Sequence, residues 1–415
     1  MSLNFQRHIL ANGLTLLVHE DHTTPMAACN IVYKVGSRDE DPNLTGMAHL
    51  FEHYMFCGSK HIADYDRPLQ SVGAINNAYT SQDITHYYAI LPANNLETLL
   101  WLESDRMLEL AFDAEQLEIQ RNVVIEEFKE VCINRPFGDA WMKLSELTYQ
   151  KHPYAWTPIG KCIGHIEKIT MDDMKSFFFR YYRPNNAVLV IAGNVHFDEC
   201  IALAEKWFGG IPAGPSIERA YPQEPPQTAA RQLTWQGKVP YSLLLKSWRM
   251  SRRLHPDFYT CDLLTDLLGD GKNSYLYQNL VVKNKMFTDI SASVSATFDE
   301  GMLVITGRPA EGVAIEEADA QLNKLLYNFA FPDSLEHDLQ RVKNKVESIL
   351  LTNEIKLEDR STSLAVAEAI SHAEDFEDEK EHYFAVTSKQ MQEMMHGLLT
   401  EEKSNTLFYV PENER

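Results

Sequence analysis

The sequence predicts an α+β protein with two related domains, each a mixed sheet flanked by helices. Three observations support this prediction. The chain has 415 residues, 44% of them hydrophobic, which is enough for more than one hydrophobic core. A segment rich in proline and glycine, 209–231, lies near the middle and has the composition of a linker. On both sides of it, strand patterns and long helical patterns follow one another in a similar order.

In the first half, apolar runs and apolar–polar alternation predict both strands and helices. The strands are expected at 13–20, 27–36, 84–92 and 187–195, and the helices at 43–57, 96–110 and 114–133. Asp113 and Gln116 form a capping-box pattern, which places the start of the last of these helices.

In the second half, the same patterns predict strands at 241–249 and 302–308, and helices at 259–268, 315–328 and 335–352. No residue-level repeat relates the halves, so the inferred duplication rests on their common layout. We therefore expect domains at 1–212 and 232–415, joined by a linker at 213–231.

Charge and cysteine content exclude several classes of protein. The 38 basic and 59 acidic residues give a net charge of −21, which argues against nucleic acid or an anionic membrane as a partner. Six cysteines without a C-x-x-C pair predict reduced, buried thiols. The apolar runs are too short to span a membrane, and no signal peptide is visible. We expect a cytoplasmic protein, or a periplasmic one if a signal peptide has been removed.

The residues that carry chemistry lie in the predicted helix 43–57. His49 and His53 are four positions apart, so both imidazoles project from one face of a helix and can bind one small ion. Glu52 lies at the edge of that face. Two histidines and a nearby carboxylate that is not itself a ligand suit a catalytic zinc ion with a general base. The order H-x-x-E-H is a known catalytic signature.

A hydrolytic zinc site of this kind needs a third protein ligand, usually a carboxylate. The predicted helix 114–133 offers Glu126, Glu127 and Glu130. Spacing alone does not choose among these three, and a solvated acidic face is the plain alternative.

Together these segments resemble the M16 family of zinc metallopeptidases, which includes pitrilysin, insulin-degrading enzyme and the mitochondrial processing peptidase. In that family H-x-x-E-H is followed by an E-R-x-V-V-x-x-E segment. The stretch from Arg121 to Glu127 matches it, and Glu127 lies 74 positions after His53, as the family spacing requires. The resemblance therefore implies one zinc ion per chain, bound by His49, His53 and Glu127, with Glu52 as the catalytic base. It also implies two domains of the LuxS/MPP-like metallohydrolase fold that form a clamshell.

A second stretch, from Gly73 to Thr80, resembles the family's G-x-x-N-A-x-T sequence. In the family this stretch is an edge strand beside the zinc helix, where an extended substrate pairs with the backbone. The resemblance implies that Asn77, Ala78 and Tyr79 bind substrate. An ordinary hairpin is the alternative, because Asn-Asn-Ala favours a turn in any protein.

The chain departs from the family pattern at two places. Gln120 stands where the E-R-x-V-V segment begins with a glutamate, so a carboxylate that would support the metal ligands is replaced by an amide. Val281 and Thr288 stand where the second domain of the family carries an arginine and a tyrosine that stabilise the reacting carbonyl. Lys283, Lys285 or Arg308 could substitute for the missing pair.

The resemblance implies a zinc-dependent endopeptidase that hydrolyses unfolded peptides. Because the arginine and the tyrosine are missing, we expect this chain to be the zinc-bearing subunit of a heterodimer. A homologous M16 subunit would then supply that pair, and a homodimer would form in its absence. The alternative is a non-catalytic assembly or peptide-binding subunit, as some relatives are. A small-molecule metal hydrolase is a third alternative, for which the sequence contains no cofactor motif.

Overall fold

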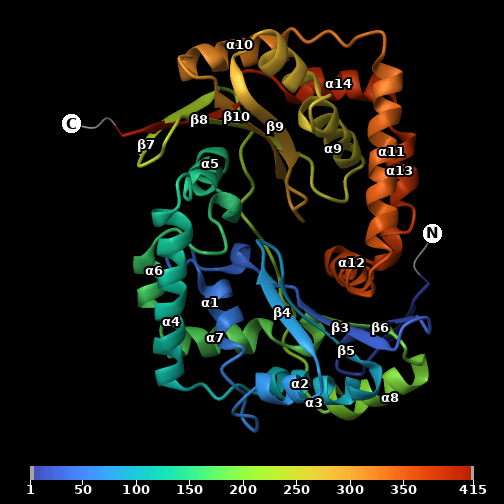
Figure 1. Cartoon of the computed structure of the whole chain (residues 1–415). Helices are drawn as coiled ribbons and strands as arrows, with labels where there is room; N and C mark the ends of the chain where they lie inside the picture. The colour runs from blue at the N-terminus through green and yellow to red at the C-terminus, as the bar shows by residue number, and fades with distance from the viewer. Residues whose placement is uncertain (1–3, 413–415) are drawn as a thin grey trace. The chain divides into compact units, whose positions relative to one another are not determined.

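The computed structural model describes residues 4–412, so the first and last three residues, which our domain predictions include, lie outside it. The helices and strands form two compact units, and each unit contains one mixed sheet (Figure 1). The predicted α+β fold class is confirmed. The strands and helices predicted at 84–92, 187–195 and 96–110 are found with end shifts of a few residues.

The sheet of unit 1 has its most apolar strands at its centre. Its order is β1 (Gln6–Ile9), β2 (Thr15–Glu20), β6 (Ala187–Gly193), β3 (Met26–Tyr33), β5 (Thr85–Pro92) and β4 (Ile75–Thr80). Strand β6 runs parallel to β2 and antiparallel to β3, and all seven of its residues are buried. In β4, which lies at one edge, exposed and half-buried residues alternate. An edge strand with one solvated face gives this alternation.

The helices of unit 1 come from both halves of the sequence. They are α1 (Met47–Tyr54), α2 (Asp66–Ser71), α3 (Leu96–Leu108), α4 (Ala114–Phe128), α6 (Ile163–Lys168), α7 (Met171–Tyr181), α8 (Phe197–Phe208) and α12 (Leu357–Ile370). Helix α12 lies on β3 and β6, where Leu357 packs against Ala28 and Ala192. A helix from residues 351–378 thus belongs to the first sheet.

The sheet of unit 2 has the order β7 (Arg231–Gly237), β11 (Asn405–Pro411), β8 (Leu243–Met250), β10 (Gly301–Pro309) and β9 (Phe287–Val294). Its helices are α5 (Ala140–Thr148), α9 (Pro256–Gly269), α10 (Ile315–Tyr327), α11 (Leu335–Asn353), α13 (Glu379–Ala385) and α14 (Ser388–Leu398). Helix α5 comes from the first half of the sequence and packs on β8 and β11, with Leu144 fully buried.

Each unit therefore includes a segment from the other half of the chain. Residues 129–155 belong to unit 2, and residues 351–378 belong to unit 1. The chain crosses from unit 1 to unit 2 again between Tyr221 and Pro222, inside the irregular stretch 212–230. The domain bounds 1–212 and 232–415 stay a prediction.

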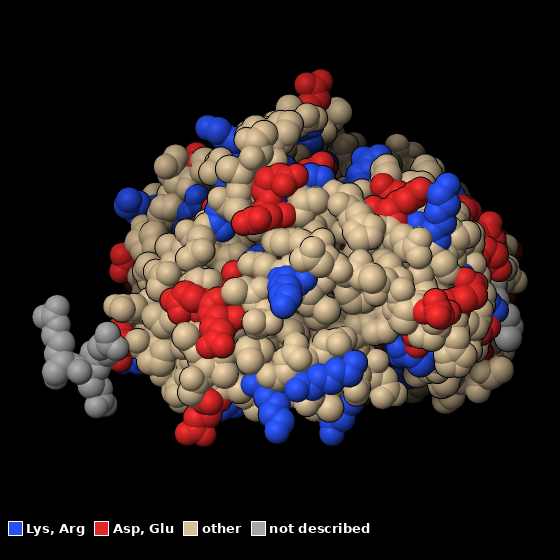
Figure 2. All heavy atoms as spheres, turned by 90° about the horizontal axis from the view of Figure 1, so that it is seen from above, with Lys and Arg blue, Asp and Glu red and all other residues tan. Residues whose placement is uncertain are grey.

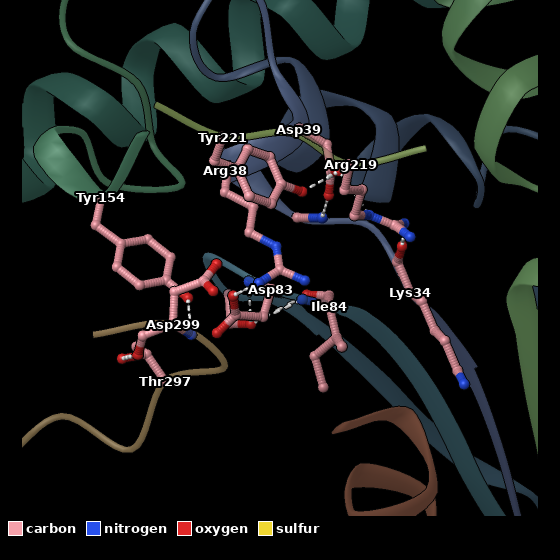
Figure 3. Close-up of polar contacts among 12 residues, drawn as sticks. Lys34, Arg38, Asp39, Asp83, Ile84, Tyr154, Arg219, Tyr221, Thr297 and Asp299 are labelled. Carbon is pink, nitrogen blue, oxygen red and sulfur yellow. Dashed lines mark hydrogen bonds and ion pairs between the residues drawn. The ribbon is translucent and has the colours of Figure 1, made fainter. Parts of the chain in front are cut away.

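The first part of the irregular stretch is fixed to unit 1 by Asp39 (Figure 3). The Asp39 carboxylate accepts from the guanidinium of Arg219 at 3.0 Å and from the hydroxyl of Tyr221 at 2.7 Å. Arg38 lies over the ring of Tyr221 and forms a 2.8 Å ion pair with the buried Asp83. The segment up to Tyr221 therefore has defined partners within its own unit.

Two predicted helices differ in length from the structure. The helix predicted at 43–57 begins at Met47, because Gly46 has a left-handed φ of 92° and cannot continue a helix. The helix predicted at 114–133 remains α-helical as far as Phe128 and continues as a π-helical segment, Lys129–Asn134. Asp113 caps its start, since its carboxylate accepts from the N–H groups of Glu115 and Gln116.

The surface charges, the helices and the cysteines concern the predictions made from charge, hydropathy and cysteine content. On the face that Figure 2 shows, acidic and basic side chains lie interspersed in small groups. Within residues 4–412, no helix is both long and apolar enough to cross a membrane. All six cysteines are free, and Cys29, Cys200 and Cys261 are buried, whereas Cys162 is exposed. The prediction of buried thiols is therefore wrong for Cys162, and Cys57 and Cys132 are only half-buried.

Candidate metal centre and active site

Helix α1 is short, and its start is fixed by a buried carboxylate. One oxygen of Glu40 accepts from the N–H of Ala48 at 2.8 Å, and the other accepts from the N–H of Gly46 at 3.0 Å. The indole N–H of Trp156 donates to the same side chain at 3.1 Å. Helix N-termini leave such N–H groups unsatisfied, and Glu40 supplies acceptors for two of them although burial raises its pKa to about 8. Glu40 therefore sets the position of the helix that carries the H-x-x-E-H motif.

The structure brings the two histidines of this helix together with Glu127. The His49 and His53 rings meet edge to face with centroids 4.8 Å apart. One carboxylate oxygen of Glu127 lies 3.7 Å from Nε2 of His49 and 3.4 Å from Nε2 of His53. One potential ligand atom from each of the three residues lies within 4.8 Å of the other two. The ring nitrogens and the carboxylate thus converge on one point.

The surroundings of these groups suit a cation. Burial lowers the pKa of His49 to about 4, so this imidazole is neutral at pH 7 and has a lone pair to donate. The hydrogen bond to Glu127 raises the pKa of His53 and lowers the pKa of Glu127. Two imidazoles that face one carboxylate are the donor set that zinc prefers in hydrolytic sites. The residues present therefore fit a zinc ion.

Glu52 lies beside this point but has a different partner. It is 8% exposed and accepts a 2.6 Å hydrogen bond from the hydroxyl of Thr80 on β4. Burial raises the pKa of Glu52, and the hydrogen bond from Thr80 opposes that rise. A carboxylate with a raised pKa that remains outside the ligand set suits a group that accepts and returns a proton.

The three glutamates of helix α4 and the adjoining segment have different surroundings. Glu127 faces the histidines, whereas Glu126 is exposed and Glu130 lies 3.7 Å from Arg135 at the surface. Of these three glutamates, Glu127 is the one that lies beside both histidines. Gln120, two turns earlier on α4, lies near His53 and contributes to the raised pKa of that imidazole.

Strand β4 presents backbone groups at the free edge of the sheet. Its hairpin closes with a hydrogen bond from the N–H of Ser81 to the carbonyl of Ile84. Because an antiparallel ladder alternates, Tyr79 exchanges bonds with His86 on β5, while Ala78 turns its N–H and carbonyl away from β5. The N–H of Ala78 donates to the side-chain oxygen of Asn77 at 2.8 Å.

A pocket of about 610 Å³ adjoins the motif. Its lining joins parts of α1, α2, β4 and α4: Glu52, His53, Phe56, Cys57, Ala63, Asp64, Asp66, Asn77, Ala78, Gln116 and Gln120. The pocket therefore places the general-base candidate, one histidine and the edge strand around one space. Asp64 and Asp66 add negative charge to it.

The positions of the missing arginine and tyrosine lie in unit 2. Val281 is in the π-helical segment Tyr277–Lys283 and packs against the core of that unit. Thr288 is in β9, and its hydroxyl donates to the carbonyl of Pro309 at 3.4 Å. A valine has no donor for a developing oxyanion, and the hydroxyl of this threonine has a backbone partner.

The candidate substitutes also have partners or remain at the surface of unit 2. The guanidinium of Arg308 stacks on the ring of Tyr241 at 3.8 Å from its centroid. Lys283 is exposed and lies 3.4 Å from the side-chain oxygen of Asn279. Lys285 is exposed, with a φ of 52°. Their role in place of the missing pair stays a prediction.

Two family models match the chain, and together they cover most of it. Residues 15–157, which include the motif and Glu127, match the model described as insulinase, peptidase family M16. Residues 168–346 match the model described as the peptidase M16 inactive domain. The chain belongs to the M16 peptidase family.

Relatives in this family extend over most of the chain. The zinc protease PqqE of Helicobacter pylori is 28% identical over 350 residues, which are 83% of this chain and 79% of that protein. YmxG of Bacillus subtilis, named as an uncharacterized zinc protease, is 27% identical over 73% of each chain. The crystal structure of a protease from Helicobacter pylori has a TM-score of 0.90 at 25% identity and covers 99% of this chain and 100% of that chain. These M16 relatives support a peptidase function and suggest zinc.

Some site residues of this M16 chain were not predicted from the sequence. Thr80 was part of the G-x-x-N-A-x-T match, and that place in the motif was the available signal for its bond to Glu52. Glu40 lies six residues before Gly46, outside any pattern that periodicity detects. Asp64 and Asp66 come from a short loop and helix, and nothing in their spacing linked them to the motif.

Proposed function

We propose that the chain is a zinc-dependent endopeptidase that hydrolyses unfolded peptides, with one zinc ion bound by His49, His53 and Glu127. The convergence of these three side chains within 4.8 Å, with Glu52 on the same helix as both histidines, is the observation that carries the proposal. When bound, zinc supplies a Lewis acid that polarises a carbonyl and makes water acidic enough to react near neutral pH.

The chain's own groups move the proton. A carboxylate oxygen of Glu52 takes it from the attacking water and returns it to the leaving amine nitrogen. The hydroxyl of Thr80 orients the Glu52 carboxylate during both steps, because it donates to Oε2 of Glu52 at 2.6 Å. Burial of Glu52 strengthens the base by raising its pKa, so that it can hold the proton between the two steps.

The free edge of β4 is the proposed binding surface for substrate. An extended peptide would pair with the N–H and carbonyl of Ala78, and backbone pairing is independent of side-chain sequence. The N–H of Ala78 now donates to the side-chain oxygen of Asn77, and a peptide carbonyl would replace that oxygen when substrate binds. Asp64 and Asp66 in the adjoining pocket would favour basic side chains. Folded proteins have few free extended segments, so unfolded peptides suit this edge.

The proposed active state is a heterodimer with a homologous M16 subunit that supplies an arginine and a tyrosine. Val281 and Thr288 in this chain offer neither group, and this is the observation behind the proposed partner. A homodimer is the proposed form in the absence of that partner. The second candidate function is a non-catalytic subunit, which the same two substitutions favour.

Metal content and peptide cleavage test the proposal together. The purified chain should contain a zinc ion at this site, Glu127→Gln should lose it, and Glu126→Gln, one residue away and exposed, should retain it. Glu52→Gln should retain zinc and lose cleavage of an unfolded peptide. Absence of zinc in the wild-type chain would overturn the metal site, and an active Glu52→Gln variant would overturn the assigned base.

The partner is tested by adding it. The chain alone should cleave slowly, and a homologous subunit with the arginine and tyrosine should raise the rate. Full activity of the chain alone would refute the heterodimer. Stoichiometric zinc with no cleavage, whether or not the partner is present, would favour the non-catalytic subunit.

A further inference from the structure

A second group of potential metal ligands lies in unit 1, apart from the motif. Glu20 is the last residue of β2, His22 follows it after one residue, and His196 directly precedes α8. The two imidazole rings have centroids 4.9 Å apart. Oε2 of Glu20 lies 3.3 Å from Nε2 of His22 and 3.9 Å from Nδ1 of His196. One donor atom from each residue again falls within 4.8 Å of the others.

Neighbouring groups fix the orientation of two of these ligands. The other oxygen of Glu20 accepts from the N–H of Phe197 at 2.7 Å. Nδ1 of His22 lies 2.9 Å from the side-chain oxygen of Asn194, so this nitrogen carries the proton that is donated. In a neutral ring Nε2 then has a lone pair, and it faces a carboxylate oxygen. A proton or a metal ion can therefore lie between Nε2 of His22 and Oε2 of Glu20.

Two other ligand clusters within residues 4–412 can be compared with this one. The donor set of two histidines and one glutamate is the same as that of His49, His53 and Glu127. A third cluster, of Glu368, His372 and Glu374, already contains a cation, because the guanidinium of Arg7 pairs with both glutamates at 2.5 Å. Glu20, His22 and His196 have no lysine or arginine partner among the described ion pairs.

We propose that Glu20, His22 and His196 bind a second divalent transition-metal ion. Imidazole nitrogens with one carboxylate favour zinc, nickel, cobalt or copper over magnesium and calcium, which prefer all-oxygen ligands. The side chains are 33%, 48% and 65% exposed, so the ion exchanges with solvent more readily than an ion at the motif. It would tie the loop after β2 to the loop before α8.

Titration of zinc into the full chain tests this site, with binding measured by calorimetry and the bound metal measured by elemental analysis. The wild type should bind two zinc ions, a tighter one and a weaker one. His22→Ala and His196→Ala should each weaken the second ion at least tenfold, and the double variant should lose it while retaining the first. His8→Ala is the matched control, because His8 faces Glu205 at 3.5 Å without a second histidine, and both ions should remain.

The outcomes also separate this site from the motif. A His49→Ala/His53→Ala variant should lose the tighter ion and retain the weaker one, and circular dichroism reports whether it is folded. The proposal is overturned if the wild type binds a single zinc ion, which would mean that a proton alone bridges His22 and Glu20. It is also overturned if the weaker ion persists in the His22→Ala/His196→Ala variant. Either result leaves the proposed peptidase function untouched.

Discussion

Removal of the Glu40 side chain should destabilise helix α1 and weaken metal binding. In the folded chain this carboxylate is 7% exposed and accepts from the backbone N–H groups of Gly46 and Ala48 and from the indole of Trp156. Gly46 directly precedes the helix that carries His49 and His53, and Ala48 lies in its first turn. Glu40→Ala leaves them buried without an acceptor.

The size of the effect follows from those contacts. Each buried N–H that loses its acceptor costs about 1–3 kcal/mol, and the Trp156 indole also donates to the carbonyl of Ser37 at 2.8 Å. The two backbone groups therefore predict a loss of about 2–6 kcal/mol in the free energy of unfolding for Glu40→Ala. Glu40→Gln retains one acceptor oxygen, so about 1–3 kcal/mol is expected. Zinc affinity should fall by about 10–100-fold in the alanine variant, as for other groups that support metal ligands.

Urea unfolding of the metal-free chain and competitive zinc titration measure the two effects. Thr170→Ala is the control, because Thr170 caps α7 by accepting from the N–H of Asp173, and α7 carries none of the proposed ligands. The control should cost about 1 kcal/mol and leave zinc affinity unchanged. The reasoning is refuted if Glu40→Ala unfolds at the wild-type urea concentration, or if Thr170→Ala loses as much zinc affinity as Glu40→Ala.

Three further predictions follow from single contacts. Thr80→Val removes the hydrogen bond that lowers the pKa of Glu52, so the acid limb of the kcat/KM profile should move to higher pH; an unmoved limb would contradict this. Burial lowers the pKa of His86 to about 3, and its Nε2 contacts Asn30 at 2.7 Å. As pH falls below about 6.5, the histidine at position 86 is protonated in the unfolded chain but stays neutral in the folded chain, which favours unfolding. Between pH 8 and pH 5, the free energy of unfolding of the wild type should therefore drop by about 2 kcal/mol more than that of His86→Gln. Gly46→Ala should lower the free energy of unfolding by about 1–2 kcal/mol, because φ of Gly46 is 92° and the new Cβ would lie 3.2 Å from the carbonyl oxygen of Ile159. Equal urea midpoints for the variant and the wild type would refute this.

The centre of the site was predictable because its spacing is local. His49, Glu52 and His53 lie within five residues, and helical geometry alone places both imidazoles on one face. Glu127 is distant in the sequence, so its choice over Glu126 and Glu130 depended on the family resemblance. Glu40 escaped prediction because its role is to accept N–H groups six and eight residues ahead, and only the folded turn between them brings these groups together.

The fold shows a similar division between what patterns reveal and what only packing decides. Strands β3 and β6 are almost wholly buried, so their continuous apolar runs were a clear signal. Edge strand β7 reads Arg-Gln-Leu-Thr-Trp-Gln-Gly, in which only Leu233 and Trp235 alternate with polar residues, and it was missed beside the proline-rich stretch. Helix α12 was also missed, because the side chains that it buries against β3 and β6 are mostly small, such as Ala365 and Ala369. Small residues allow close packing but give weak periodicity.

Metal binding and turnover can be separated by experiment, because the proposed ligands and Val281 belong to different units. His49, Glu52, His53 and Glu127 all belong to unit 1, whereas Val281 belongs to unit 2. Val281→Arg, which restores the family residue, should therefore leave zinc affinity unchanged. If the missing donor limits catalysis, that variant should raise kcat in the chain alone, and Val281→Lys should raise it less, because an ammonium lacks the planar fork of a guanidinium. A variant that changed zinc affinity instead would show that unit 2 influences the ligands directly.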